Sequence, residues 1–272
     1  MNPAYLDLAA RIAQRTDRDQ PLIVGLCGPQ GSGKSTMAAA LKNLLEGRGC
    51  TAAVLSIDDF YLSRADREVL ARTVHPLFET RGVPGTHDVP LLLDVLASLQ
   101  REGIVSVPRF DKAKDDRLPR EQWEQVQAPV KVIILEGWCV GAVPQPEPLL
   151  EAPVNALEER EDPKGEWRRH VNHALGSEYR AVFEQIGLLI LLAAPGFEVV
   201  YRWRLQQEEE LRQAVLARGG EVSQVMDERA LERFISHYER LTRYILEEMP
   251  QRADIVMRLD HERRMTVEAR SG

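Results

Sequence analysis

The sequence predicts an α/β fold in which a mostly parallel sheet carries helices on both faces. Short runs rich in Leu, Ile and Val alternate with longer stretches of helical spacing, the pattern of strands and crossover helices in a buried parallel sheet. The first run leads into a glycine-rich stretch and then directly into a helix-forming sequence, as in a phosphate-binding βα unit. Together these observations favour an open sheet with a ligand site at the carboxyl ends of its strands.

Six apolar runs are expected to form strands. The last run alternates with polar residues that include Arg258, which indicates a strand near the edge of the sheet. The inner runs lack this alternation, as expected of strands that are buried on both faces. The expected strands span residues 22–27, 52–57, 104–107, 130–135, 188–193 and 255–259.

Capping and breaking residues mark the expected helices. Asp88 is placed to cap one helix, Gly219 and Gly220 end another, and Pro250 ends the last. The segment 144–153 holds four prolines and is expected to be an extended loop. The expected helices span residues 1–20, 35–46, 90–101, 178–185, 199–218 and 227–248.

Composition excludes several classes of protein. The 272 residues suit one α/β domain with insertions, so we expect a single domain over residues 1–272. The net charge of −7 disfavours a nucleic-acid partner. Three cysteines, an odd number, argue against a disulfide framework and favour a reducing, cytoplasmic location. The most apolar stretch, residues 186–197, is shorter than the roughly 20 residues that cross a bilayer, so no membrane span is expected. The oligomeric state stays open.

The stretch 28–35 reads G-x-x-x-x-G-K-S, the P-loop motif, in the strand–motif–helix context that the motif requires. We expect Lys34 to bridge the β- and γ-phosphates of ATP and the Ser35 hydroxyl to ligate Mg²⁺. A chance glycine-rich turn is the alternative, and the register of strand, motif and helix disfavours it. The sequence therefore predicts a P-loop NTPase fold. The expected ATP-binding residues are Gly28, Pro29, Gln30, Gly31, Ser32, Gly33, Lys34, Ser35 and Thr36.

Carboxylates follow two of the expected strands. Glu136 ends the run 130–135 and is the expected second metal ligand, a Glu in place of the more usual Asp. Asp58 and Asp59 end the second strand, and because adjacent side chains point in opposite directions, one should face the acceptor. We expect Asp58 to take the proton from an acceptor hydroxyl and Asp59 to support it or bind a metal-bound water. A solvated strand end at Glu136 and a turn-capping Asp pair are the alternatives.

The order and spacing of several segments resemble the plant-type D-glycerate 3-kinase family. This family is similar to the uridine kinases, phosphoribulokinases and pantothenate kinases, in which an acidic residue after the second strand is the base. The resemblance implies that base at Asp58 and implies transfer of the ATP γ-phosphate to the 3-hydroxyl of D-glycerate. It covers nearly the whole chain from Leu22 onward. The segments that carry it are 28–35, 56–61, 81–88, 108–112, 135–138 and 201–206.

A carboxylate-bearing acceptor calls for a guanidinium group, and three arginines lie in loops after strands or turns. We expect Arg109 to act in catalysis on the acceptor side, the alternative being a solvent-facing charge. Residues 113–117 replace a glycine-rich stretch of the family, so this loop should be stiffer and more charged. Asp88 has a helix cap as its alternative role. The other expected acceptor residues are Arg81, His87, Asp88, Asp111 and Arg117.

The segment 196–220 is the expected lid, because a kinase must exclude water from its γ-phosphate. Arg202, Arg204 and Arg212 are candidates to neutralise charge on the transferred phosphoryl group. The alternative is an ordinary helix laced by ion pairs at i,i+4 spacing.

Other functions remain open at this point. A P-loop kinase of this kind could act on uridine, pantothenate or ribulose 5-phosphate instead of D-glycerate. A nucleotide-dependent regulatory NTPase is an alternative from a different class, as is an assembly NTPase. The last would need a protein partner, for which the sequence shows no exposed apolar stripe or heptad.

Overall fold

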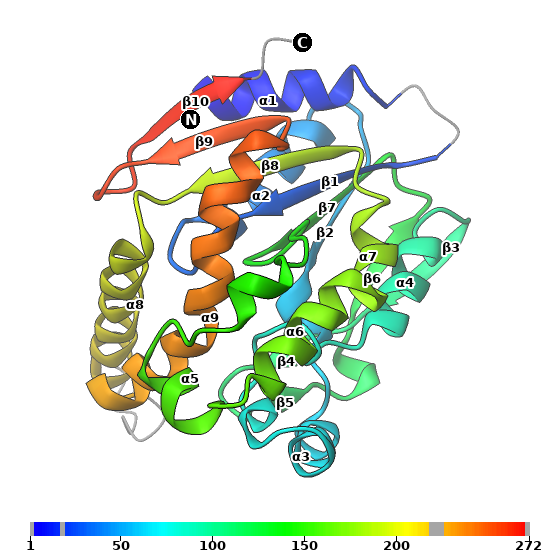
Figure 1. Cartoon of the computed structure of the whole chain (residues 1–272). Coiled ribbons are helices and arrows are strands. Elements are labelled where there is room, and N and C mark those ends of the chain that lie inside the picture. Colours follow the sequence, from blue (N-terminus) through cyan, green and yellow to red (C-terminus); the bar gives the residue numbers. More distant parts are fainter. Residues whose placement is uncertain (1–2, 17–19, 218–225, 270–272) are drawn as a thin grey trace.

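A six-stranded sheet forms the centre of the molecule in the computed structural model, which describes residues 3–16, 20–217 and 226–269 (Figure 1). Its strands are β1 (Leu22–Cys27), β2 (Ala52–Ser56), β7 (Val132–Gly137), β8 (Leu188–Ala193), β9 (Ile255–Leu259) and β10 (Met265–Ala269). Their order across the sheet is β10-β9-β8-β1-β7-β2. All neighbours are parallel except β10, which runs antiparallel to β9. This confirms the predicted α/β fold.

Helices cover both faces of the sheet (Figure 1). Those described are α1 (Pro3–Ala13), α2 (Lys34–Glu46), α3 (Arg64–Thr73), α4 (Val89–Ser98), α5 (Ala156–Glu161), α6 (Glu166–Gly176), α7 (Glu178–Phe183), α8 (Phe197–Ala217) and α9 (Glu228–Glu248). Side chains of α1, α2 and α8 share one apolar cluster with the sheet, and those of α4, α6 and α7 share the other. Helix α9 contributes buried side chains to both clusters.

Strand β1 shows why the inner strands lack alternation. Ile23 and Cys27 join the cluster beneath α4, α6 and α7, whereas Val24 and Leu26 join the cluster beneath α1 and α2. Because consecutive side chains of a strand point to opposite faces, a strand covered on both sides must be apolar at every position. Because β1 is buried on both faces, the loop between β1 and α2 begins at a fixed point at the carboxyl end of the sheet.

One expected strand of the central sheet lies elsewhere, and that prediction was wrong. The run 104–107 falls in β3 (Gly103–Val107), which pairs antiparallel with β6 (Glu124–Ala128) in a separate two-stranded sheet. Ile104 is 70% exposed there, whereas Val105 and Val107 on the other face of β3 are buried in the core. Short apolar runs alone do not distinguish an outlying ribbon from an inner strand.

Several boundaries also differ from the sequence expectation. The helix expected over residues 1–20 is described as α1 over Pro3–Ala13 only, with residues 1–2 and 17–19 outside the described residues. Helices α3, α5 and α6 and strand β10 were not predicted. The expected cap at Asp88 is confirmed, because its carboxylate accepts a hydrogen bond from the Leu91 N–H at 3.1 Å.

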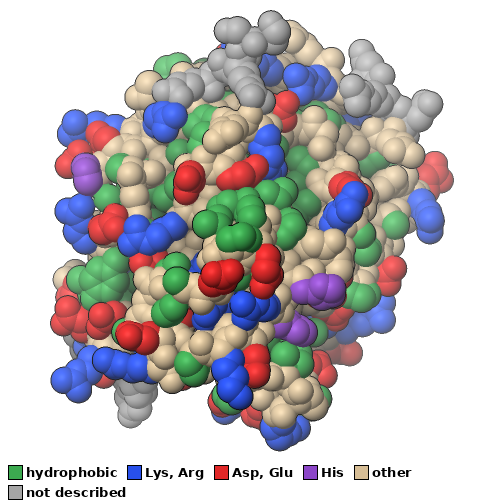
Figure 2. Space-filling view, in the orientation of Figure 1, with side chains coloured by type: hydrophobic (Ala, Val, Ile, Leu, Met, Phe, Trp, Pro, Cys, Tyr) green, Lys and Arg blue, Asp and Glu red, His purple; other side chains and the backbone are tan. Residues whose placement is uncertain are grey.

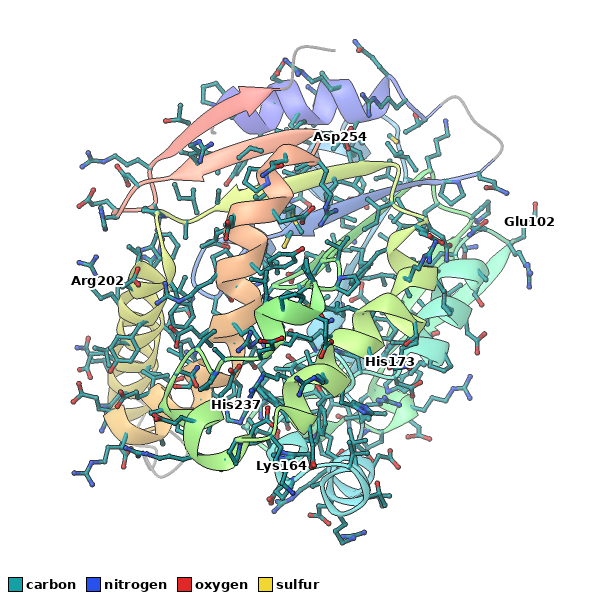
Figure 3. All side chains as sticks on the ribbon, in the orientation of Figure 1. Glu102, Lys164, His173, Arg202, His237 and Asp254 are labelled. Carbon is teal, nitrogen blue, oxygen red and sulfur yellow. The ribbon has the colours of Figure 1, made fainter. Side chains whose placement is uncertain are left out.

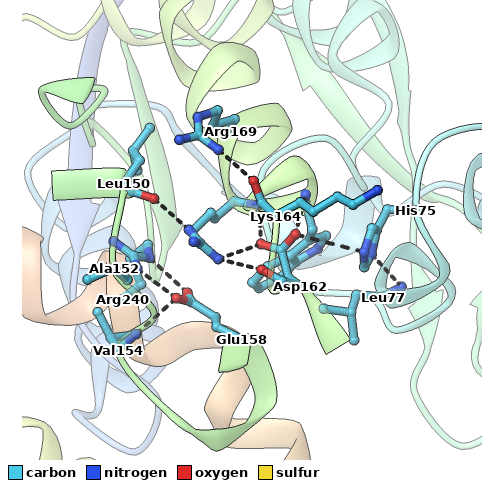
Figure 4. A network of polar contacts seen from close by, with 12 residues as sticks. His75, Leu77, Leu150, Ala152, Val154, Glu158, Asp162, Lys164, Arg169 and Arg240 are labelled. Atoms are coloured by element: carbon cyan, nitrogen blue, oxygen red, sulfur yellow. Dashed lines mark hydrogen bonds and ion pairs between the residues drawn. The ribbon is translucent and has the colours of Figure 1, made fainter. Parts of the chain in front are cut away.

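Two buried ion pairs hold the proline-rich loop 144–153 (Figure 4). Arg168, 2% exposed, pairs with Asp162 at 3.1 Å and donates to the Leu150 carbonyl at 2.7 Å. Arg240 on α9 pairs with Glu158 at 2.6 Å and donates to loop carbonyls as well. Buried charges are tolerated when their hydrogen bonds are satisfied in this way. The prediction of an extended loop was wrong over part of this segment, since Glu147–Leu150 form a short 3₁₀ helix, η4. The network fixes the segment against α6 and α9.

The surface and the cysteines carry little functional signal. Figure 2 shows acidic and basic side chains interspersed over the face that it displays. Cys27, Cys50 and Cys139 are buried free thiols, as expected of small apolar residues. Within the described ranges, no helix combines the length and the apolar character that crossing a membrane requires.

Candidate active site

The loop between β1 and α2 has the conformation of a phosphate-binding loop. Gly33 precedes α2 with φ of 86°, in the left-handed region that favours glycine. Lys34 is the first residue of α2, so its side chain and the free N–H groups of the first helical turn lie at the same place. This arrangement suits an anion at the helix N-terminus.

Glu136 lies beside the P-loop because β7 neighbours β1. The register pairs Leu26 with Glu136, so Glu136 is at the carboxyl end of β7 where the loop begins. The Ser35 hydroxyl donates to Glu136 Oε1 at 2.8 Å. Glu136 is only 4% exposed, and its second oxygen, Oε2, has no hydrogen-bond partner among the described residues. The structure therefore brings the two expected metal ligands together.

The unpaired atoms of this region fit ATP and a divalent metal. Gln30 Oε1 and Ser32 Oγ are also buried without a partner in the described part of the chain. No group of three or more His, Cys, Asp or Glu side chains suited to a metal occurs among the described residues. One hydroxyl and one carboxylate nevertheless suffice for Mg²⁺, which takes its other ligands from water and substrate phosphates. When bound, a metal–ATP complex supplies a polarised γ-phosphoryl group at this point.

A cavity of about 280 Å³ opens beside the P-loop. It contains the cations Lys34, Arg81, Lys112 and Arg204, and the carboxylates Asp58 and Glu136. The excess of positive charge suits a site that receives both a polyanionic nucleotide and an anionic acceptor. The lining residues are Gln30, Gly31, Lys34, Ser35, Ser56, Asp58, Tyr61, Arg81, Lys112, Glu136, Arg204, Gln207, Phe234 and Tyr238.

Asp58 lies in a 3₁₀ turn, η1 (Ile57–Phe60), that directly follows β2. Its Oδ2 accepts a bond from Lys112 Nζ at 2.7 Å, and its Oδ1 accepts one from the Tyr61 hydroxyl at 3.0 Å. Burial alone would raise the pKa of Asp58, but the ammonium groups of Lys112 and Lys34 outweigh it and hold that pKa below its usual range. Asp58 is therefore an ionised carboxylate that faces the cavity.

Asp59 has different partners and does not line the cavity. One carboxylate oxygen accepts the Phe110 N–H at 3.1 Å, and the other pairs with Arg109 at 2.6 Å. Arg109 also pairs with Glu124 of β6 and likewise stays outside the cavity. Of the Asp58–Asp59 pair, Asp58 alone lines this cavity. Asp59 and Arg109 instead join the 3₁₀ turn to the β3–β6 ribbon.

Among the expected acceptor residues, Arg81 alone lines the cavity. His87 is buried behind Tyr61, with ring centroids 4.5 Å apart, and its Nδ1 lies 2.5 Å from the Tyr179 hydroxyl. Burial lowers the pKa of His87 to about 4, so this imidazole is neutral and supplies no charge to an acid. Asp88 caps α4 and pairs with Arg117 at 3.1 Å.

The remaining expected residue, Asp111, shapes a loop. It belongs to β4 (Phe110–Asp111), which pairs with β5 (Asp116–Arg117) in a short hairpin. Its Oδ1 accepts the N–H groups of Ala113 at 3.0 Å and Lys114 at 3.2 Å. This contact closes the hairpin turn from which Lys112 reaches the cavity.

Helix α8 brings one of the three expected lid arginines to the site. Arg204 lines the cavity and pairs with Glu208 of the same helix. Arg202 is exposed, on the outer side of α8 (Figure 3), with its Nη2 3.1 Å from His261 Nδ1. Arg212 pairs with Glu209 at 3.6 Å and does not line the cavity. Residues 218–220 of the expected lid lie outside the described residues.

Gly31 joins the P-loop to α8, and its replacement by Ala is expected to weaken ATP binding about tenfold. Its φ is 78°, and an added Cβ would lie 2.7 Å from Trp203 Cβ. A non-glycine residue costs roughly 1–2 kcal/mol in this conformation, and relieving the clash moves the loop or the helix. Titration calorimetry with ATP measures the change. Gly49→Ala is the matched control, because Gly49 has φ of 74° with nothing within 4 Å; an equal ATP-affinity loss in both variants would contradict the prediction.

Several cavity residues had no assigned role in the sequence analysis. Lys112 stood within a family segment, but an exposed loop lysine carries no signal of its own. Tyr61 follows the Asp pair, and only the 3₁₀ turn reveals that its hydroxyl returns to Asp58. Phe234 and Tyr238 come from α9, far away in sequence. Their helical spacing of four was visible, whereas the site that they face was not.

The fold and the site together define a P-loop kinase, an ATP-dependent phosphotransferase that uses a divalent metal. The phosphoribulokinase/uridine kinase family model matches residues 23–149, and the chain belongs to this family of kinases. An uncharacterized kinase of Schizosaccharomyces pombe is 38% identical over 80% of this chain and 79% of its own length. These matches confirm the family resemblance seen in the sequence.

Two relatives carry a more specific name. The chloroplastic D-glycerate 3-kinase of Arabidopsis thaliana is 35% identical over 71% of this chain, although the match spans only 42% of that protein. The solved structure of a D-glycerate 3-kinase from Cryptococcus neoformans superimposes with a TM-score of 0.79 at 26% identity. The superposition covers 99% of this chain and 100% of the Cryptococcus chain. The class of small-molecule kinase is thereby shown.

Proposed function

We propose that the protein phosphorylates a small hydroxy acid, D-glycerate, at its 3-hydroxyl, with ATP as donor and Mg²⁺ as metal. The observation that carries this proposal is the position of Asp58. Its carboxylate faces one cavity with the P-loop Lys34 and with the cations Arg81 and Lys112. The names of the Arabidopsis and Cryptococcus relatives support the same acceptor.

Each residue has a role that follows from its place. Lys34 and the α2 N-terminus bind the phosphates, while Ser35 and Glu136 hold the metal. Asp58 accepts a hydrogen bond from the acceptor hydroxyl and orients its oxygen toward the γ-phosphoryl group. It takes the proton as the new O–P bond forms and the bond from the γ-phosphorus to the leaving ADP breaks. Arg204 neutralises charge on the phosphoryl group, and α8 excludes water as a lid of a single kinase domain.

Arg109 and Asp59 act indirectly in this scheme. Their ion pair of 2.6 Å and the Phe110 N–H bond fix the turn that carries Asp58. We therefore assign them to positioning of the base, in place of acceptor or metal binding.

The character of the cavity favours a small acid over a nucleoside. Its volume of about 280 Å³ is shared with the P-loop side, so the space that remains for the acceptor is small. A nucleoside would bring no charge to the cations at the acceptor end, whereas a carboxylate would pair with them. Three-carbon acids that carry a hydroxyl meet both requirements.

An acceptor panel tests the proposal. ADP release is measured with D-glycerate, L-glycerate, glycerol, uridine, pantothenate and ribulose 5-phosphate, and phosphorus NMR identifies the product. We expect turnover with D-glycerate and formation of the 3-phospho ester. Turnover with uridine, pantothenate or ribulose 5-phosphate alone would refute the acceptor and leave the kinase class intact. Slow hydrolysis that no acceptor stimulates would favour a regulatory NTPase instead.

A further inference from the structure

Lys112 lies on a hairpin that is firmly anchored next to the cavity. The β4–β5 hairpin is held by Arg67 of α3, which is only 1% exposed. Arg67 donates to the Asp115 carbonyl at 2.7 Å and to its carboxylate at 2.9 Å. The other carboxylate oxygen of Asp115 pairs with Arg81. The base of the turn is therefore fixed, while the Lys112 side chain extends from it and is 61% exposed.

Both oxygens of Asp58 are occupied in this arrangement. Lys112 Nζ takes Oδ2 at 2.7 Å, and the Tyr61 hydroxyl takes Oδ1 at 3.0 Å. An acceptor hydroxyl that donates to Asp58 must displace one of these partners, or share its oxygen. Tyr61 is buried, stacked on His87 and in edge contact with Phe110 at 5.3 Å, so it is held in place. The exposed lysine is the partner that can move.

The other cations of the cavity are committed elsewhere. Arg81 is paired with Asp115, and Arg204 is paired with Glu208. Lys34 belongs to the phosphate end. Lys112 is thus the cavity cation whose partner is the catalytic carboxylate itself.

We infer that Lys112 selects acceptors that carry a carboxylate. The Lys112 ammonium moves from Asp58 to the carboxylate of the acceptor, and this exchange frees Asp58 for the acceptor hydroxyl. The inference rests on the proposed function and names the residue that sets its acceptor specificity. A neutral polyol offers no replacement for the lost ion pair, so Lys112 stays on Asp58 and competes with the acceptor hydroxyl for the carboxylate. The contact between Lys112 and Asp58 therefore favours hydroxy acids and disfavours neutral alcohols. Specificity arises both from binding the right acceptor and from disfavouring the wrong one.

The Lys112→Gln variant separates these two effects. We expect the KM for D-glycerate to rise about 30-fold, because a charge-assisted contact to the carboxylate is lost. We expect glycerol turnover to rise several-fold at the same time, because Lys112 no longer competes for Asp58. Lys112→Arg restores the low KM for D-glycerate. Steady-state ADP release with D-glycerate and with glycerol measures the wild type and both variants.

Lys114→Gln is the matched control, because Lys114 lies two residues away and pairs with Asp111 at 3.6 Å. Its kinetic constants are expected to equal those of the wild type. An equal loss for D-glycerate and glycerol in Lys112→Gln, or an unchanged KM for D-glycerate, overturns the inference. A wild-type enzyme inactive with D-glycerate refutes the proposed function first, and the inference with it. If the wild type is active with D-glycerate and Lys112→Gln shows either of these two results, the inference alone is refuted.

Discussion

Replacing Asp58 with Asn is expected to lower kcat for acceptor phosphorylation by about a hundredfold or more. The amide keeps the size of the side chain but cannot take the proton from the acceptor hydroxyl. It also removes the negative charge that Lys112 and Lys34 face. ATP affinity should change little, because the P-loop contacts are intact. Coupled ADP release gives kcat, and calorimetry gives the ATP affinity.

The pH profile offers an independent check on Asp58. Its pKa is held below the ordinary 3.8, so the folded enzyme keeps it ionised at neutral pH. Protonation of this base therefore costs no kcat/KM, the constant that reports the free enzyme, as the pH falls from 8 to 5. An acid limb near pH 6 that disappears in Asp58→Asn would contradict the assignment. Asp94→Asn, at an exposed position on α4, should match the wild type.

Replacing Glu136 with Gln is expected to lower kcat by about a hundredfold and to raise the metal concentration needed for activity. The amide oxygen can still accept from Ser35, so the hydrogen bond of 2.8 Å survives. The negative charge and the unpaired Oε2 are lost. Activity titrated with Mg²⁺ and with Mn²⁺ measures the shift.

The control for this variant is Glu102→Gln, because Glu102 lies exposed at the outer end of the β3 ribbon (Figure 3). It should leave the metal dependence unchanged. If Glu136→Gln bound metal–ATP and turned over as the wild type does, Glu136 would be a structural partner of Ser35 only. Thermal unfolding with and without metal–ATP would then show equal stabilisation of both proteins.

The phosphate half of the site could be predicted from local sequence. The strand, the loop and the helix around Lys34 are contiguous, so motif and context are read together. Glu136 followed because the end of a buried strand is recognisable and parallel strands align their carboxyl ends. Asp58 followed by the same reasoning. These residues could be predicted because they lie in one contiguous motif or at the carboxyl ends of recognisable strands.

The acceptor half could not be predicted in the same way. Its residues come from the hairpin, the 3₁₀ turn and α9, which only the tertiary fold brings together. Arg109 was expected at the acceptor, but a nearby carboxylate, Asp59, pairs with it at 2.6 Å. Ion pairs between segments that are far apart in the chain leave no periodic pattern in the sequence, so they could not be predicted from it.

The missed elements have comparable causes. Strand β10 alternates and leaves Val267 43% exposed, so it resembles a loop of mixed polarity. Helix α6 buries Arg168, a residue that pattern reading assigns to the surface. The run at Ile104 shows the opposite error, in which an apolar residue is exposed.

The β4–β5 hairpin has an evolutionary consequence. It pairs only with itself and stands apart from the central sheet, to which its contacts run through side chains such as Lys112. The contact that anchors it, between Arg67 of α3 and Asp115, involves no residue that lines the cavity on either side of this ion pair. Such a segment can diverge or be grafted without disturbing the nucleotide machinery. Rewriting the eight residues from 110 to 117 would therefore change one contributor to the cavity, beside the 3₁₀ turn and α9, and leave the P-loop residues as they are.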